Sequence, residues 1–165
     1  MERRDAMNVP QIYIESTVFN FVFNTDSPEM TRDAVTLFEL IGQGKFAAYT
    51  SQYVRDELEA APEPKRSNML ALIDKYNIIT LSKSPDAARL ANIYIAEGAV
   101  PVNSREDAHH IATTAVKGLD YIVSYNFKHI VRSKTITMTG AINQRESYKP
   151  IKILSPTEVI NYDKD

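Results

Sequence analysis

Residues 103–130 read NSREDAHHIATTAVKGLDYIVSYNFKHI, and this stretch decides the fold class. One apolar helical face is formed by Ala108, Ile111, Ala112 and Ala115. Gly118 ends the predicted helix, and residues 121–123 form a short apolar run typical of a buried strand. The pattern therefore predicts a helix followed by a strand of a parallel sheet.

Two polar side chains in this stretch need an explanation. Asp107 lies one turn before Ile111 on the apolar face, and a carboxylate buried there is costly without a partner. Asn126 lies just past the predicted strand, in a polar and basic turn. These two side chains are the first candidates for a functional site.

The rest of the chain repeats the alternation of strand and helix. Strands are predicted at residues 11–14, 46–49, 77–81 and 151–154, and helices at 28–41, 51–61, 65–76 and 84–97. In the helix at 28–41 the expected inward residues are Val35, Phe38 and Ile41, and residues 19–23 are expected to add core aromatics. Residues 133–150 are predicted to form a long basic loop with at most a short helical turn.

This alternation predicts an α/β fold, with a mostly parallel central sheet and helices on both faces in a three-layer α/β/α sandwich. We expect residues 1–10 to be a flexible arm and residues 11–160 to be a single domain.

Composition narrows the class of protein. The 165 residues include no cysteine, which excludes disulfides and zinc–thiolate sites. No signal peptide or membrane span is recognised, so we expect a cytoplasmic protein without a membrane partner. Residues 117–152 carry 7 Lys/Arg against 2 Asp/Glu, whereas residues 1–116 carry 11 against 16. The basic flank suits a polyanion, although a merely solvated face explains the charge equally well.

Four polar side chains are predicted to meet at one edge of the sheet. Glu15 follows the first strand, Glu57 lies on the inward face of the helix after the second, and Asp107 begins the helix before the fourth strand. Asn126 follows that fourth strand, and ligands bind at this edge of parallel sheets. An all-oxygen set suits Mg²⁺ or Mn²⁺, held by Glu15, Glu57 and Asp107, with Asn126 assisting catalysis. Such an ion activates water for phosphodiester hydrolysis.

These residues resemble the PIN domains, small metal-dependent ribonucleases that include the VapC-like toxins of toxin–antitoxin pairs. The segments at 13–17 (YIEST), 51–58 (SQYVRDEL), 107–112 (DAHHIA) and 123–130 (VSYNFKHI) are similar to the family's four motifs. The resemblance implies a PIN-like fold, an RNA substrate, a cognate antitoxin and a homodimer. Lys128, His129 and Arg132 are then expected near the RNA phosphates.

Other interpretations stay open at this point. Asp107 and Glu15 each suit a helix cap, Glu57 suits an ion pair with a Lys or Arg, and His110 suits a hydrogen-bonded packing role better than a metal ligand. Asn126 stands where the family has an acid, and Asn is common in turns. A catalytically weakened PIN-like module that binds RNA or protein is therefore the alternative function. A metal-dependent phosphatase is disfavoured, since its Asp-x-Asp pair is missing after the first strand.

Overall fold

A parallel sheet forms the centre of the molecule. The computed structural model describes residues 9–24 and 26–162. Its strands are β1 (Gln11–Ile14), β2 (Ala47–Ser51), β3 (Ile79–Leu81), β4 (Tyr121–Val123) and β5 (Lys152–Leu154). They are ordered β3-β2-β1-β4-β5, and every neighbouring pair is parallel. The predicted parallel sheet is confirmed, with β1 in the middle.

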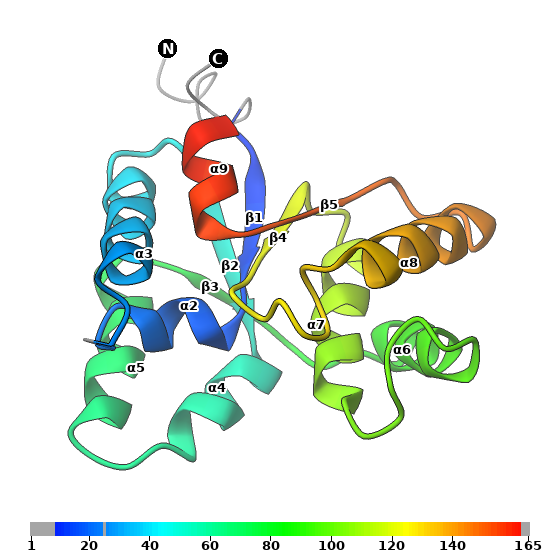
Figure 1. Ribbon diagram of the computed structural model, residues 1–165, viewed down its shortest axis with the longest axis horizontal. Helices are drawn as coiled ribbons and strands as arrows, with labels where there is room; N and C mark the ends of the chain where they lie inside the picture. Colours follow the sequence, from blue (N-terminus) through cyan, green and yellow to red (C-terminus); the bar gives the residue numbers. More distant parts are fainter. Residues whose placement is uncertain (1–8, 25, 163–165) are drawn as a thin grey trace.

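Helices cover both faces of this sheet. They are α2 (Ser16–Phe21), α3 (Pro28–Gly42), α4 (Gln52–Glu59), α5 (Lys65–Lys75), α6 (Pro85–Ala96), α7 (Arg105–Val116), α8 (Ser133–Arg145) and α9 (Pro156–Tyr162). Figure 1 shows α3 and α9 packed on one side, with α6, α7 and α8 on the other. The expected three-layer α/β/α architecture is confirmed.

The core is centred on β1. Ile12, Tyr13 and Ile14 are all fully buried, as expected for a strand covered on both faces. Phe19 of α2 and Phe38 of α3 pack with tilted rings on one side of the sheet, their centroids 5.4 Å apart. The carboxyl end of the central strand, where the polar site begins, is thus packed within the core.

The segment after β4 differs from its prediction. Residues 133–145 form α8 and not a loop. The buried face of α8 consists of Thr135, Thr139, Ile142 and Asn143. These residues have helical spacing, but most are polar, so the apolar periodicity that reveals a helix in sequence is absent. Their polar groups are partly satisfied within the fold, since the Thr135 hydroxyl donates to the Ala99 carbonyl at 3.1 Å.

Two details of the predicted core are also wrong. The inward face of α3 carries Ala34 and Leu37 beside Phe38 and Ile41, whereas Val35 is 36% exposed. Phe23 is 37% exposed, so the aromatic run at 19–23 is not wholly core.

None of the helices in the described residues is long and apolar enough to cross a membrane. Most of the expected N-terminal arm, residues 1–8, lies outside the described residues.

The contact between α6 and α8 gives the first prediction. Tyr94, fully buried, donates its hydroxyl to Oδ1 of Asn143, which is 1% exposed. Tyr94→Phe leaves that oxygen buried without a donor, so we expect the free energy of unfolding to fall by about 1–3 kcal/mol in urea titrations. The double variant Tyr94→Phe/Asn143→Leu removes both partners and should cost less than Tyr94→Phe alone. An unchanged stability of Tyr94→Phe would contradict the role of this bond.

Candidate metal centre

The end of β1 places Glu15 in a ring of hydrogen-bond donors. Its side chain is buried, with the whole residue 2% exposed. Oε1 accepts from the hydroxyls of Ser124 at 2.5 Å and Thr17 at 2.6 Å. Oε2 accepts from the Ser16 hydroxyl at 2.7 Å and from the backbone N–H of Thr17 at 3.3 Å, which caps α2. The expected cap is therefore real, and the hydroxyls additionally hold both carboxylate oxygens in place.

A buried histidine links three elements next to Glu15. His110 of α7 is fully buried, and its Nε2 lies 2.7 Å from Oε1 of Glu57 in α4. Its Nδ1 lies 2.7 Å from the hydroxyl of Tyr13 in β1, which lies 2.6 Å from Oγ of Ser51. The Ser16 hydroxyl, which has a single proton and donates to Glu15, also lies 3.0 Å from Oε1 of Glu57 and so shares that proton between the two carboxylates. A continuous chain of polar groups thus joins β1, α4 and α7, and the partner of Glu57 is a His rather than the suggested Lys or Arg.

This chain favours an ion pair between His110 and Glu57. Burial acts to lower the pKa of His110, but the hydrogen bond and charge of Glu57, with the charges of Glu15 and Asp107, raise it above its usual value. Burial acts to raise the pKa of Glu57, yet His110 and the Ser16 hydroxyl bring it below its usual value. With both ring nitrogens protonated, His110 donates to Glu57 and to Tyr13, which donates on to Ser51.

Asp107 lies in the first turn of α7 and is poorly compensated. Its Oδ1 accepts from Nδ2 of Asn126 at 3.1 Å, whereas in the described residues no backbone amide of α7 donates to it, which argues against the capping interpretation. Burial, together with the charges of Glu15 and Glu57, raises the pKa of Asp107 to about 6, despite opposing effects of the His110 charge and the Asn126 bond.

The side chain of Asn126, in the loop after β4, makes two hydrogen bonds. Its Oδ1 accepts from the backbone N–H of His129 at 2.9 Å while its Nδ2 reaches Asp107. The side chain therefore shapes its own turn and at the same time positions a carboxylate of the site.

The donor set suits a divalent cation. Ligand atoms of Glu15, Glu57 and His110 all lie within 4.8 Å of one another. Asp107 is outside that cluster, although its pKa responds to both glutamates. A cation would offset the repulsion that raises the pKa of Asp107, and oxygen donors are the ligands that Mg²⁺ and Mn²⁺ prefer. The structure thus brings Glu15 and Glu57 together, with Asp107 and Asn126 beside them.

Sequence reasoning assigned His110 to packing and missed its place in this cluster. His110 is hydrogen-bonded as expected, but its ring also lies within the acidic cluster, where it pairs with Glu57. One signal was present, since Asp107 and His110 are three residues apart and so share a face of α7. The hydroxyls of Ser51 and Ser124 had no such signal, because their partners are far away in the sequence.

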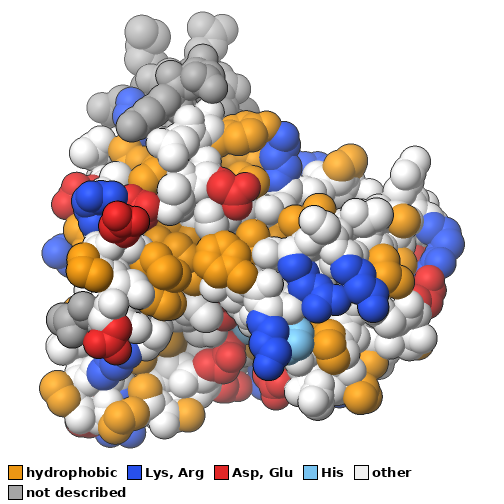
Figure 2. Space-filling view, in the orientation of Figure 1, with side chains coloured by type: hydrophobic (Ala, Val, Ile, Leu, Met, Phe, Trp, Pro, Cys, Tyr) orange, Lys and Arg blue, Asp and Glu red, His pale blue; other side chains and the backbone are white. Residues whose placement is uncertain are grey.

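Basic side chains lie beside the acidic cluster. Figure 2 shows Lys and Arg side chains gathered next to a His where the β4–α8 loop runs, with acidic side chains in the hollow toward α4. Lys128 is exposed, whereas His129 and Arg132 are partly buried. Nη1 of Arg132 donates to the Lys128 carbonyl at 3.1 Å, so Arg132 also braces the loop.

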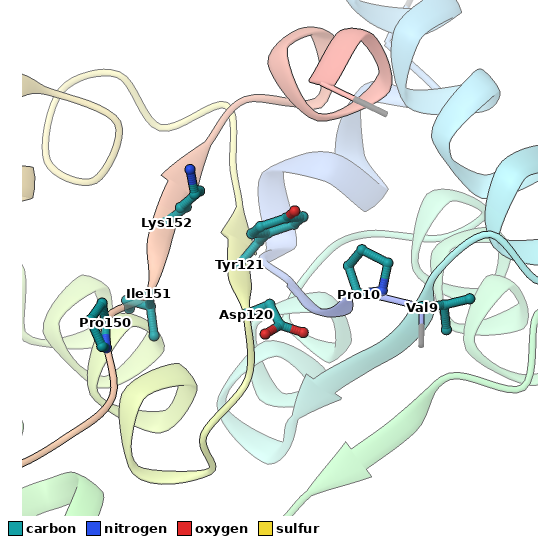
Figure 3. A pocket seen from close by; sticks show the side chains of 7 residues that line it. All are labelled: Val9, Pro10, Asp120, Tyr121, Pro150, Ile151 and Lys152. Carbon is teal, nitrogen blue, oxygen red and sulfur yellow. The ribbon is translucent and has the colours of Figure 1, made fainter. Parts of the chain in front are cut away.

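A pocket of about 550 Å³ lies at the opposite, amino-terminal edge of the strands (Figure 3). Its lining consists of Val9, Pro10, Asp120, Tyr121, Pro150, Ile151 and Lys152. Asp120 accepts from the Gln11 backbone N–H at 2.7 Å and from Lys149 at 2.8 Å. Asp120 is the only acid among the described residues that line this pocket, and its carboxylate is paired, so the pocket lacks the clustered acids of the other edge.

Three solved structures share this fold. They are the sarcin–ricin loop cleaving toxin VapC20 of Mycobacterium tuberculosis, VapBC2 of Rickettsia felis bound to a DNA fragment from its promoter, and DNA-bound VapBC of Salmonella typhimurium. Their identities to this chain are 15%, 9% and 13%, and the TM-scores are 0.52, 0.53 and 0.54. The alignments cover 72%, 88% and 90% of this chain, and 92%, 98% and 99% of theirs. No protein-family model and no curated protein matches the sequence. The similarity establishes the VapC-like PIN fold and no more.

The raised pKa of Asp107 gives a prediction for stability. Its pKa is about 6 in the folded protein against an ordinary 3.8, so its ionisation weakens folding as pH rises from about 4 to about 6. At pH 7 in chelator, we expect Asp107→Asn to be more stable than the original protein by about 1 kcal/mol, allowing for solvent screening. At pH 4 the gain should vanish.

The control is Asp86→Asn, which removes an exposed acid from the first turn of α6. Asp86→Asn should not increase stability at either pH, because the Asp86 carboxylate interacts favourably with the positive end of the helix dipole. Adding Mg²⁺ should stabilise the original protein more than Asp107→Asn. A gain for Asp107→Asn that is equal at pH 4 and pH 7 would show that ionisation is not its source.

Proposed function

We propose that this protein, which has the fold of the VapC structures, is a divalent-metal-dependent endoribonuclease that hydrolyses RNA phosphodiester bonds. The observation that carries the proposal is the packing of Glu15 and Glu57, with Asp107 nearby, at the carboxyl edge of the central strands. Open α/β sheets bind their ligands at this edge.

In the proposed mechanism Glu15, Glu57 and Asp107 hold Mg²⁺ or Mn²⁺. When bound, the ion supplies Lewis-acid activation of water and of the phosphodiester. His110 orients Glu57 through its 2.7 Å contact, and Asn126 holds Asp107. Catalytic metal sites depend on such supporting hydrogen bonds.

The basic loop supplies affinity for the substrate in this proposal. Lys128, exposed at the loop, contacts the RNA phosphates, with His129 and Arg132 beside it. Phosphate contacts of this kind position a strand without reading its sequence. Substrate preference must therefore come from another part of the site.

We further propose that the protein is the toxin of a type II toxin–antitoxin pair and acts in the cytoplasm as a homodimer with a cognate antitoxin. The similar VapC20 is described as a toxin that cleaves the sarcin–ricin loop. A small DNA-binding protein encoded by the adjacent gene would support this assignment.

Removing a proposed ligand tests the nuclease directly. We expect Glu57→Gln to lower cleavage of defined RNAs in Mg²⁺ or Mn²⁺ by more than about 100-fold, since the amide is a weaker ligand and no longer pairs with His110 as an anion. Glu59→Gln changes an exposed acid on the same helix and should cleave normally. Full activity of both Glu57→Gln and Asp107→Asn would refute the site, and cleavage that survives chelator would indicate a contaminant.

A second candidate function is a PIN-like module with weakened catalysis that binds RNA or protein. It is favoured by one observation, the engagement of both ends of the Asn126 side chain within the fold. An amide there contributes one negative charge fewer than an acid, which weakens the hold on a cation.

Asn126→Asp separates the two functions. The new carboxylate loses the bond to Asp107 and repels it, so without metal the free energy of unfolding should fall by about 1 kcal/mol or more. If missing charge limits an active nuclease, this variant binds Mn²⁺ more tightly and cleaves RNA faster. Asn68→Asp, an exposed site away from the cluster, should change neither property. RNA binding without cleavage in both the original protein and Asn126→Asp would favour the binding module.

A further inference from the structure

A second recess adjoins the acidic cluster. It has a volume of about 410 Å³ and is formed by α4, the segment after β3 and the start of α7. Glu57 lines this recess and also belongs to the cluster. Tyr53 and Lys83 of the recess follow β2 and β3, on one side of β1, whereas the loop that carries Lys128 follows β4 on the other side.

The recess contains a flat aromatic stack. The rings of Tyr53 and His109 are nearly parallel, at an interplanar angle of 21° with centroids 4.5 Å apart. Tyr53 and Glu57 are four residues apart in α4, so the stack and the carboxylate share one face of the helix.

A cation covers the stack. Nζ of Lys83 lies 4.8 Å from the centroid of the Tyr53 ring and 3.0 Å from Oδ2 of Asp56. Both side chains of this ion pair are about half exposed, and exposed pairs contribute little to stability. Lys83 can therefore leave the ring at small cost when a flat group takes its place.

The charges around the recess favour a neutral ligand. The lining contains two basic residues, Lys83 and Arg105, and three acidic residues, Asp56, Glu57 and Glu106. A lining with cations outnumbered by acids is a poor site for a phosphate but offers donors and acceptors to an uncharged heteroaromatic ring. Aromatic side chains stack bases of single-stranded nucleic acids in this way.

We propose that the recess is a nucleobase subsite, in which a base near the scissile phosphate extends the Tyr53–His109 stack and displaces Lys83 toward the RNA backbone. This inference rests on the proposed function, because the strand is taken to run from the Lys128 loop across the acidic cluster. It assigns the choice of substrate base to Tyr53 and the polar rim of the recess, whereas Lys128 and its neighbours provide affinity.

The test uses short single-stranded RNAs with 2-aminopurine at successive internal positions, bound to the full chain in chelator so that no metal-dependent cleavage occurs. Stacking on Tyr53 should quench the fluorescence of the probe at one position. Tyr53→Leu, which keeps an apolar side chain but removes the ring, should abolish that quenching and weaken binding about 5- to 100-fold. Tyr53→Phe should retain both the quenching and the binding, and that result would show that the fold tolerates substitution at this position.

The chain offers a matched control at its far end. Nζ of Lys152 lies 4.6 Å from the ring centroid of Tyr162 and bonds its hydroxyl, so this is another Lys–Tyr contact, outside the proposed site. Tyr162→Leu should bind and quench like the original protein. Lys83→Met should lower the dependence of log K on log salt by about 0.7, the loss of one phosphate contact.

The possible outcomes separate this inference from the nuclease itself. Quenching that persists in Tyr53→Leu, absence of quenching at every position in the original protein, or an unchanged salt slope in Lys83→Met would overturn the subsite as described. Chelator-sensitive cleavage with unaltered binding by Tyr53→Leu would remove the subsite and leave the nuclease. Tyr53-dependent quenching in a protein that never cleaves RNA would support the subsite and remove the nuclease.

Discussion

The contact between His110 and Glu57 is the interaction on which the carboxyl edge of the sheet depends. A fully buried imidazole bonds at both nitrogens, to Tyr13 in the central strand and to Glu57 in α4. His110 is fully buried whereas the Glu57 side chain is 37% exposed, so loss of Glu57 would leave a buried charge on His110 uncompensated, which costs more than an exposed pair contributes. The pair therefore fixes α4 and α7 against β1, and it supplies an internal positive charge that lets acidic side chains approach one another before any metal binds.

The three carboxylates of the site are compensated to different degrees. Glu15 accepts four hydrogen bonds, and Glu57 pairs with His110 and the Ser16 hydroxyl. Asp107 receives the amide of Asn126, and its pKa of about 6 reflects burial beside two other acids. A bound cation would therefore stabilise the ionised form of Asp107 more than that of the other two carboxylates. Without the cation, the ionised Asp107 lowers the stability of the fold, which is a feature typical of functional sites.

The sequence predicted the architecture better than the site. The parallel sheet followed from apolar runs at regular intervals, and Glu15, Glu57 and Asp107 followed from their positions relative to those runs. The helix α8 was not predicted, because its buried face is largely threonine and asparagine. The burial of these residues depends on partners such as the Ala99 carbonyl, which no local sequence pattern reveals. The pairing of His110 with Glu57 was not predicted for the same reason. The sequence pattern around a histidine on a helical face is the same whether the side chain packs, forms an ion pair or binds a metal.

The strand order explains why features of opposite character adjoin the acids. Segments that follow β3, β2, β1 and β4 meet the carboxyl edge in that order, so Tyr53 with Lys83 comes first, the Glu15–Glu57 cluster next and the Lys128 loop last. Tyr53 and Glu57 lie on the same helix after β2, whereas the Lys128 loop follows β4 on the other side of β1. Aromatic and basic side chains can therefore change independently on the two sides, while the buried His110 keeps the acids between them in one geometry.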